Sequence, residues 1–170
     1  MPFDLTGKKV LVTGAGKGIE RGVAITLCES GCKVYALSRT KGPLDTLVEE
    51  HPSIVPIVAD VLNWDDTREK LEKPEALDGL VNNAGIAAIG YSAVDWTKES
   101  ICKVLDTNLL SAINCTQVIT KNMIKMKITG SIVNVSSLCG ISSFPKTLPY
   151  VMSKAGMDMA TKQFALELGP

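Results

Sequence analysis

The chain has 170 residues, and its 18 lysines and arginines balance 18 aspartates and glutamates, so the formal net charge is zero. Without excess positive charge the chain has no long-range attraction to nucleic acid or to an anionic membrane surface, and we expect neither as a partner. With 45% hydrophobic and 21% charged residues, the composition is that of a folded domain rather than a disordered or fibrous chain.

Short apolar runs alternate with segments of helical periodicity, which is typical of βαβ units. In chain order we predict a strand over residues 9–13, a helix over 18–30, a strand over 32–37, a helix over 43–50, a strand over 54–59, a helix over 64–72, a strand over 79–82, a helix over 101–125, a strand over 131–135 and a helix over 150–168. Gly31 stands where a glycine cap would end the first helix. Because the strands are continuously apolar, the fold class is α/β, with a doubly wound parallel sheet covered by helices on both faces.

A glycine-rich turn, Thr13-Gly14-Ala15-Gly16-Lys17-Gly18, joins the first strand to the first helix. Backbone N–H groups and the positive end of the helix converge there on a site for a phosphate, although the dihedral needs of a tight turn alone would also explain the glycines. At the end of the second strand, where an acidic residue would bind a free ribose 2′-hydroxyl, the chain has Ser38-Arg39. Arg39 and Lys17 suit a 2′-phosphate, which favours NADP(H) over NAD(H); two solvated surface cations are the alternative.

Tyr150 and Lys154 are four residues apart on the last predicted helix and therefore share one face. Tyrosine is a weak acid-base catalyst near neutrality because its reference pKa is about 10, but an ammonium about 5 Å away supplies roughly 3 kcal/mol of preference for the phenolate. Ser137 ends the last strand and can reach the same pocket across a predicted irregular loop over residues 138–149, whereas Ser136 is expected to point the other way. A surface contact between the tyrosine and the lysine is the plainer interpretation of this pair taken alone.

Several motifs occur in order along the chain: Thr13-Gly14-x-x-x-Gly18, Asn82-Asn83-Ala84-Gly85, Asn108, Ser137 and Tyr150-x-x-x-Lys154. Together they resemble the short-chain dehydrogenase/reductase family, and the resemblance covers the whole chain. It implies a Rossmann-type fold and NADPH-dependent reduction of a carbonyl to an alcohol by hydride transfer. Residues 10–18, 38–40, 134–137 and 165–170 look most like the family members that reduce ketoses and α-dicarbonyls. Such enzymes are usually homotetramers that pack through the long helix and the last helix.

The resemblance also implies a role for each matching residue. Tyr150 is the general acid, Ser137 holds the carbonyl oxygen, and Lys154 activates the tyrosine and binds the nicotinamide ribose. Asn108 positions a water that resupplies protons, or is a polar residue of the helix interior bonded to backbone. The cofactor-binding residues implied are Gly14, Gly16, Lys17, Gly18, Ile19, Arg39, Thr40, Asp60, Val61, Asn83, Ala84 and Gly85, together with Tyr150 and Lys154.

The sequence departs from the family pattern in two ways. Glu20 stands at the third glycine of the phosphate-binding turn. A carboxylate within about 5 Å of a phosphate costs roughly 1–3 kcal/mol and weakens binding about 10- to 100-fold, so we expect impaired NADPH affinity. The chain also stops soon after Lys154, so we expect residues 1–170 to form a single NADP-binding domain, truncated after the fifth strand and following helix, without the family's C-terminal substrate-loop region. A catalytically impaired form that binds nucleotide weakly, or that pairs with full-length subunits, is therefore the alternative to an active reductase.

The sequence carries no run of about 18 apolar residues and no signal-peptide pattern, so we expect a cytoplasmic protein without a membrane span. The odd number of widely spaced cysteines favours reduced thiols over disulfides: Cys28, Cys32, Cys102, Cys115 and Cys139. Cys28 and Cys32 are four residues apart, but no histidine or second cysteine pair completes a metal site with them, and we predict no metal.

Overall fold

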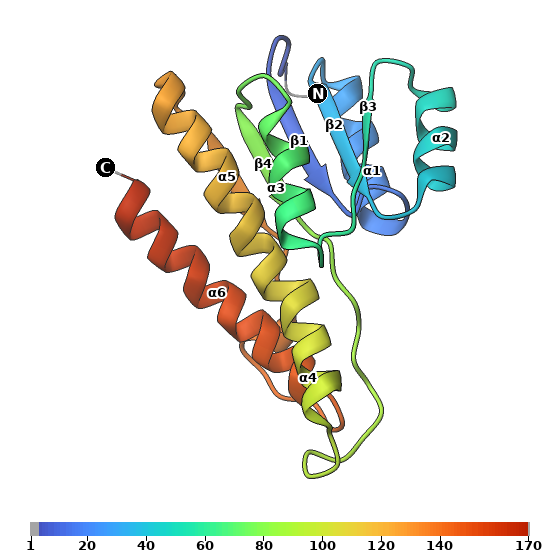
Figure 1. Cartoon of the computed structure of the whole chain (residues 1–170), viewed down its shortest axis with the longest axis vertical. Helices are drawn as coiled ribbons and strands as arrows, with labels where there is room; N and C mark the ends of the chain where they lie inside the picture. Colours follow the sequence, from blue (N-terminus) through green and yellow to red (C-terminus); the bar gives the residue numbers. More distant parts are fainter. Residues whose placement is uncertain (1–3, 170) are drawn as a thin grey trace.

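The structure is a computed structural model that describes residues 4–169. Its strands form a parallel five-stranded sheet in the order β3-β2-β1-β4-β5 (Figure 1). The strands are β1 (Lys9–Thr13), β2 (Lys33–Ser38), β3 (Val55–Val58), β4 (Gly79–Asn82) and β5 (Ser131–Asn134). The order reverses direction beside β1, so the chain winds outward from the centre of the sheet in both directions. The predicted doubly wound α/β fold is confirmed.

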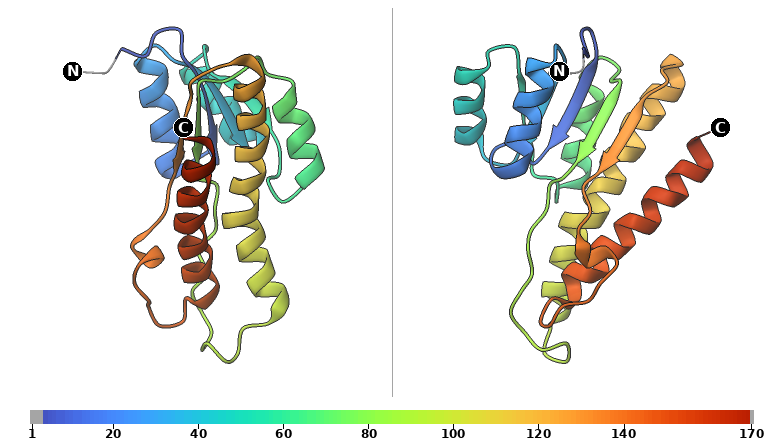
Figure 2. Two further views of the ribbon diagram at one scale, coloured as in Figure 1. Left: turned by 90° about the vertical axis from the view of Figure 1, so that its left-hand side faces the viewer. Right: turned by 180° about the vertical axis from the view of Figure 1, so that it is seen from behind.

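Helices cover both faces of this sheet, as the edge-on view in Figure 2 shows. They are α1 (Gly18–Glu29), α2 (Lys41–Glu50), α3 (Trp64–Glu72), α4 (Lys98–Leu105), α5 (Ser111–Met126) and α6 (Leu148–Leu168). Val12, Val34 and Ala36 pack against α1 and α2 on one face. Leu11 and Leu80 pack against α3 and α5 on the other. Because successive side chains point to opposite faces and both faces are covered, the central strands are apolar throughout.

The end of α1 shows why Gly31 was predicted as a cap. Gly31 has a φ of +89°, which favours glycine, and its N–H donates to the carbonyl of Cys28. The N–H of Cys32 donates to the carbonyl of Leu27, which completes the pair of bonds of a Schellman cap. A Cβ at Gly31 would lie 2.7 Å from the Thr6 hydroxyl, so the position is also too crowded for a side chain.

The predicted helix over residues 101–125 was wrong in two respects. It begins earlier, at Lys98, because the Thr97 hydroxyl accepts a hydrogen bond from the Ser100 N–H at 3.2 Å and caps the helix. It is also interrupted by a π-helical turn, Asp106–Leu110, which separates α4 from α5. A π turn inserts one extra residue into the helix, and such insertions often lie at functional sites. Here the turn carries Asn108.

Two other helices start before their predicted first residues. Helix α2 begins at Lys41 rather than at residue 43. Helix α6 begins at Leu148 rather than at residue 150, so Pro149 lies inside its first turn. Proline is tolerated there because the first N–H groups of a helix have no intrahelical acceptor. The predicted irregular loop over residues 138–149 also contains a short 3₁₀ turn, Leu138–Gly140.

Two further observations concern the whole described chain. Each of the five cysteines is a free thiol, and burial raises the pKa of Cys115 to about 12. Among residues 4–169, no helix is both long enough and apolar enough to cross a bilayer.

Candidate active site

A cavity of about 570 Å³ opens at the carboxyl ends of β1, β2 and β4, the edge of an open α/β sheet where ligands bind. The predicted cofactor-binding residues that line it are Gly14, Gly16, Lys17, Gly18, Arg39, Thr40, Asp60, Val61, Ala84 and Gly85. Of the other predicted residues, Ile19 lies at the start of α1 with its side chain exposed, and Asn83 contributes a backbone contact to the turn. Tyr150 and Lys154 lie on α6 and are not among the residues that line this cavity. The structure thus gathers most of the predicted set, from four separate loops, around one cavity.

The glycine-rich turn makes close contacts that only glycines allow. A Cβ at Gly16 would lie 2.7 Å from the Ser38 hydroxyl, and one at Gly14 would lie 3.1 Å from the Ala84 Cα. The Thr13 hydroxyl accepts hydrogen bonds from the N–H groups of Asn83 and Ala84 at 3.1 and 3.2 Å. These contacts fix the turn against the loop after β4, so the two loops form one continuous wall of the cavity.

The amino end of α1 faces this wall without a side-chain cap. The N-cap residue Lys17 makes no capping hydrogen bond, so the first N–H groups of the helix remain available to a ligand. Lys17 and Arg39 both line the cavity, and within the described residues neither forms a salt bridge with a carboxylate. Open N–H groups and unpaired cations around one cavity suit an anion that carries several phosphates.

Lys154 is almost fully buried near the carboxyl end of β5. Its Nζ donates to the carbonyl of Val135 at 2.7 Å and lies 5.8 Å from the centroid of the Tyr150 ring. Burial lowers the pKa of Lys154, and the nearby carboxylates of Asp158 and Glu20 oppose that effect. A buried ammonium held close to a tyrosine ring favours negative charge on that side chain. The four-residue spacing predicted the shared face, but not the backbone carbonyl that holds the lysine.

Ser137 and Ser136 take different positions at the end of β5. The Ser137 hydroxyl accepts a hydrogen bond from the Cys139 N–H at 3.2 Å and caps the Leu138–Gly140 turn, which contacts α6. The Ser136 hydroxyl is buried and has no hydrogen-bond partner within the described part of the chain. Ser137 thus lies on the turn that packs on the helix of Tyr150 and Lys154, and its own proton remains available for donation.

The Asn108 side chain is buried and bonded entirely to protein groups. Its Oδ1 accepts from the Ile86 N–H at 2.8 Å, and its Nδ2 donates to the Ile86 carbonyl at 2.9 Å and to the Ser153 hydroxyl at 3.2 Å. Ser153 in turn donates to the Tyr150 carbonyl at 2.8 Å. Both amide protons are therefore in use, which favours the interpretation of Asn108 as a polar residue of the helix interior bonded to backbone. The side chain fixes the cavity wall at Ile86 to the first turn of α6.

Residues that the sequence had not singled out also line the cavity: Leu37, Pro43, Ala59, Leu62, Ile86, Lys103 and Thr107. Lys103 and Thr107 are four residues apart at the junction of α4 and the π turn, so they share one face just before Asn108. The spacing shows that the two residues share a face, but it does not show that this face borders the cavity. The apolar members gave no such signal, because their positions at the cavity depend on how the strand ends align.

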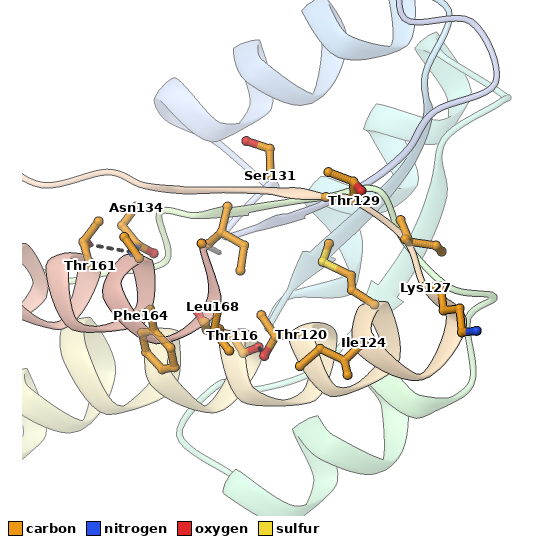
Figure 3. Close-up of a pocket in the computed structure, with 16 residues that line it drawn as sticks. Thr116, Thr120, Ile124, Lys127, Thr129, Ser131, Asn134, Thr161, Phe164 and Leu168 are labelled. Carbon is orange, nitrogen blue, oxygen red and sulfur yellow. Dashed lines mark hydrogen bonds between the residues drawn. The ribbon is translucent and has the colours of Figure 1, made fainter.

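A second hollow of about 690 Å³ lies away from these residues, between β5, α5 and α6 (Figure 3). It contains none of the predicted site residues. At its edge Asn134 donates to the Thr161 hydroxyl at 2.9 Å, the bond drawn in Figure 3, and accepts from Asn82 at 2.9 Å. No group of three or more His, Cys, Asp or Glu side chains capable of holding a metal occurs among residues 4–169.

Comparison with known proteins agrees with this arrangement. A family model described as short chain dehydrogenase matches residues 8–170. L-xylulose reductase from Homo sapiens is 41% identical over 170 residues, which cover 100% of this chain and 69% of that protein. Carbonyl reductase [NADPH] 2 from Sus scrofa is 39% identical over the same shares. The structure of a short-chain type dehydrogenase/reductase from Mycobacterium marinum has a TM-score of 0.93 at 30% identity and covers 99% of this chain and 70% of its own. The chain therefore belongs to the short-chain dehydrogenase/reductase family of oxidoreductases.

Proposed function

We propose that the chain is one NADP-binding domain that reduces the carbonyl of a ketose, such as L-xylulose, or of an α-dicarbonyl to an alcohol. The observation that carries this proposal is the buried Lys154, held by the Val135 carbonyl beside Tyr150. Burial of an ammonium is costly, and here it places the charge next to a group that can donate a proton to a substrate. The relatives named xylulose and carbonyl reductases support the same substrate class.

The cavity fits a dinucleotide with an additional phosphate. The N–H groups at the start of α1 would hold the pyrophosphate. The missing Cβ atoms of Gly14 and Gly16 let the turn pack closely against Ala84 and Ser38, which shapes the cavity around that position. Lys17 and Arg39 would pair with the 2′-phosphate of NADP(H), while Asp60 and Val61 would lie beside the adenine. The loop containing Asn83, Ala84 and Gly85 continues the wall formed by the glycine-rich turn. The name of the NADPH-dependent pig relative agrees with this preference.

The reaction divides the work between the cofactor and the chain. When bound, NADPH supplies a hydride to the carbonyl carbon. Tyr150 gives its hydroxyl proton to the carbonyl oxygen, so the C=O double bond becomes a C–H and an O–H bond. Ser137 donates a hydrogen bond to the same oxygen, and Lys154 stabilises the resulting phenolate until a proton from water restores Tyr150. The role in proton supply implied for Asn108 does not use its amide protons, since both are bonded to protein.

The test is oxidation of NADPH by the purified chain with L-xylulose or diacetyl, followed by absorbance. Tyr150→Phe removes the proton donor and keeps the ring, so we expect a loss of about 100-fold or more in turnover with little change in NADPH affinity. Tyr91→Phe is the matched control, because Tyr91 is exposed, forms an edge-to-face pair with Trp96 and does not line the cavity. Turnover that survives Tyr150→Phe would rule out this mechanism.

The position of Glu20 in the cavity supports a second candidate function, that of a form with impaired catalysis. Its carboxylate lines the cavity where phosphates are proposed to bind, and the chain spans 69% of the human relative. We therefore also propose a catalytically impaired form that binds nucleotide weakly or joins full-length subunits. Absence of NADPH oxidation by this chain, together with mixed oligomers on co-expression with a full-length relative, would favour this second function over the first.

We also propose a cytoplasmic homotetramer that packs through α5 and α6. Both helices carry large apolar side chains that are exposed in the single chain, including Ile124 and Met126 on α5 and Met159 and Leu166 on α6. Such side chains are often buried by association. Light scattering coupled to size exclusion measures the mass directly, and a monomer at micromolar concentration would contradict this arrangement.

A further inference from the structure

The Glu20 side chain folds back over the glycine-rich turn. Its Oε2 lies 3.2 Å from the point that a Cβ would occupy on Gly18, and its Cγ lies 3.4 Å from the equivalent point on Gly14. Glu20 also lines the cavity together with both glycines. The carboxylate therefore lies inside the phosphate-binding turn and not on the outer surface of α1.

Glu20 occupies the third position of α1, counted from the N-cap Lys17. A glutamate there is stabilised by the positive end of the helix, and its length lets it reach back toward the free N–H groups of the first turn. No side chain caps the helix at its N-cap residue, Lys17. Carboxylate and phosphate oxygens both accept hydrogen bonds from backbone N–H groups, so the two anions compete for this end of the helix.

The electrostatic environment places the same carboxylate near the reaction centre. Glu20 is one of two carboxylates, with Asp158, whose charge counteracts the effect of burial on the pKa of Lys154. The negative charge of Glu20, on α1, therefore affects the protonation of Lys154, on α6. The contacts with Gly14 and Gly18 place this side chain in the cavity where the dinucleotide is proposed to bind.

We propose that Glu20 occupies the phosphate position of the cofactor-free chain and reduces affinity for both NADPH and NADH by competing with the pyrophosphate. This inference rests on the proposed function, because it requires a dinucleotide in the cavity. Both cofactors contain the pyrophosphate, so Glu20 lowers the affinity of the chain for both by the same factor. Lys17 and Arg39, by contrast, discriminate between them because only NADPH carries the 2′-phosphate.

The experiment is a titration of NADPH and NADH by fluorescence against the parent chain, Glu20→Gln and Glu20→Gly. Glutamine keeps the size and removes the charge, whereas glycine removes both. We expect both variants to bind both cofactors about 10- to 100-fold more tightly than the parent chain. Glu29→Gln is the matched control, because Glu29 is an exposed carboxylate at the opposite end of α1. Circular dichroism verifies that each variant is folded.

The results of this titration distinguish failure of the inference about Glu20 from failure of the proposed function. Equal, measurable dissociation constants for the parent chain and Glu20→Gln would overturn this inference and leave the proposed function intact. Tighter binding by Glu20→Gly alone would also overturn it, because the effect would then depend on volume and not on charge. If no folded variant binds either cofactor, both the proposed function and this inference fail. Tightening of NADPH without NADH would place Glu20 at the 2′-phosphate and contradict the pyrophosphate assignment.

Discussion

Asn108 joins three segments of the chain through one amide group. Its hydrogen bonds hold both backbone groups of Ile86 in the cavity wall and the hydroxyl of Ser153 on α6. The residue is completely buried, so no solvent can take over these bonds directly. Polar groups buried without partners cost about 1–3 kcal/mol each, which makes the amide important for stability whatever its part in turnover.

Asn108→Ala should therefore lower the free energy of unfolding by about 2–4 kcal/mol, because the N–H and carbonyl of Ile86 lose their partner. Urea unfolding followed by circular dichroism measures the change. Asn122→Ala on α5 is the control, since Asn122 makes no side-chain hydrogen bond within the described residues, and its effect should stay within about 0.5 kcal/mol. An Asn108→Ala protein as stable as the parent would show that the site relaxes or admits water.

Residue spacing predicted some of the site and missed the rest for a physical reason. Tyr150 and Lys154 could be assigned to one helical face because that relation depends only on local geometry. The carbonyl partner of Lys154, at Val135, depends on how α6 packs on β5, which no local pattern encodes. The orientation of Glu20 is similar: its position in the turn was visible, but the return of its carboxylate over Gly18 was not.

At the scale of elements, the strands were easier to predict than the helix boundaries. Residues 9–13 and 79–82 were predicted with the bounds that the structure shows, because a strand buried on both faces reads as an unbroken apolar run. The π turn at Asp106–Leu110 was not predictable from periodicity. Asn108 is buried in this turn and bonded to Ile86, which is a tertiary contact that no local pattern encodes.

A surface ion network joins the amino ends of two strands to the segment after α3. Glu75 accepts from Lys9 on β1 and from Lys33 on β2, each at 2.6 Å. The two lysines lower the pKa of Glu75 from 4.5 to about 2, and the hydrogen bond from Lys33 is the largest cause. All three side chains are partly exposed, so the network is screened by salt and makes a modest contribution.

The sign of this contribution follows from the lowered pKa. The native state keeps Glu75 charged where the unfolded state becomes protonated, so its stabilisation is complete above pH 4.5 and is lost as the pH falls toward about 2. Glu75→Gln should flatten the acid limb of the stability profile between these values. Urea midpoints across that range measure it, with Glu72→Gln, an exposed neighbour outside the network, as control. Parallel profiles for the parent and Glu75→Gln would contradict the ion network.

At the scale of the whole molecule, α6 differs from the helices that pack on the sheet. Helices α1, α2, α3 and α5 contribute side chains to the two apolar clusters on the sheet. Helix α6 contributes to neither cluster and runs beside α4 and the π turn (Figure 1). Its buried residues lie in its first half, Pro149, Ser153, Lys154 and Met157, whereas most of its last ten residues are exposed.

The attachment of α6 to the sheet consists of polar contacts with one strand end. Lys154 reaches the Val135 carbonyl, and Thr161 accepts from Asn134, whose own amide oxygen accepts from Asn82. Because these hydrogen bonds join α6 to the end of β5, we expect the two elements to unfold locally together. In amide hydrogen exchange, β5 and the first half of α6 should therefore exchange as one cooperative unit, while the last turns of α6 exchange much faster. Asn134→Ala should accelerate exchange across α6 and leave α2, on the far side of the sheet, unchanged. A ligand that binds at Tyr150 and Lys154 would stabilise this cooperative unit, so its binding should be detected as slower amide exchange in β5 and the first half of α6.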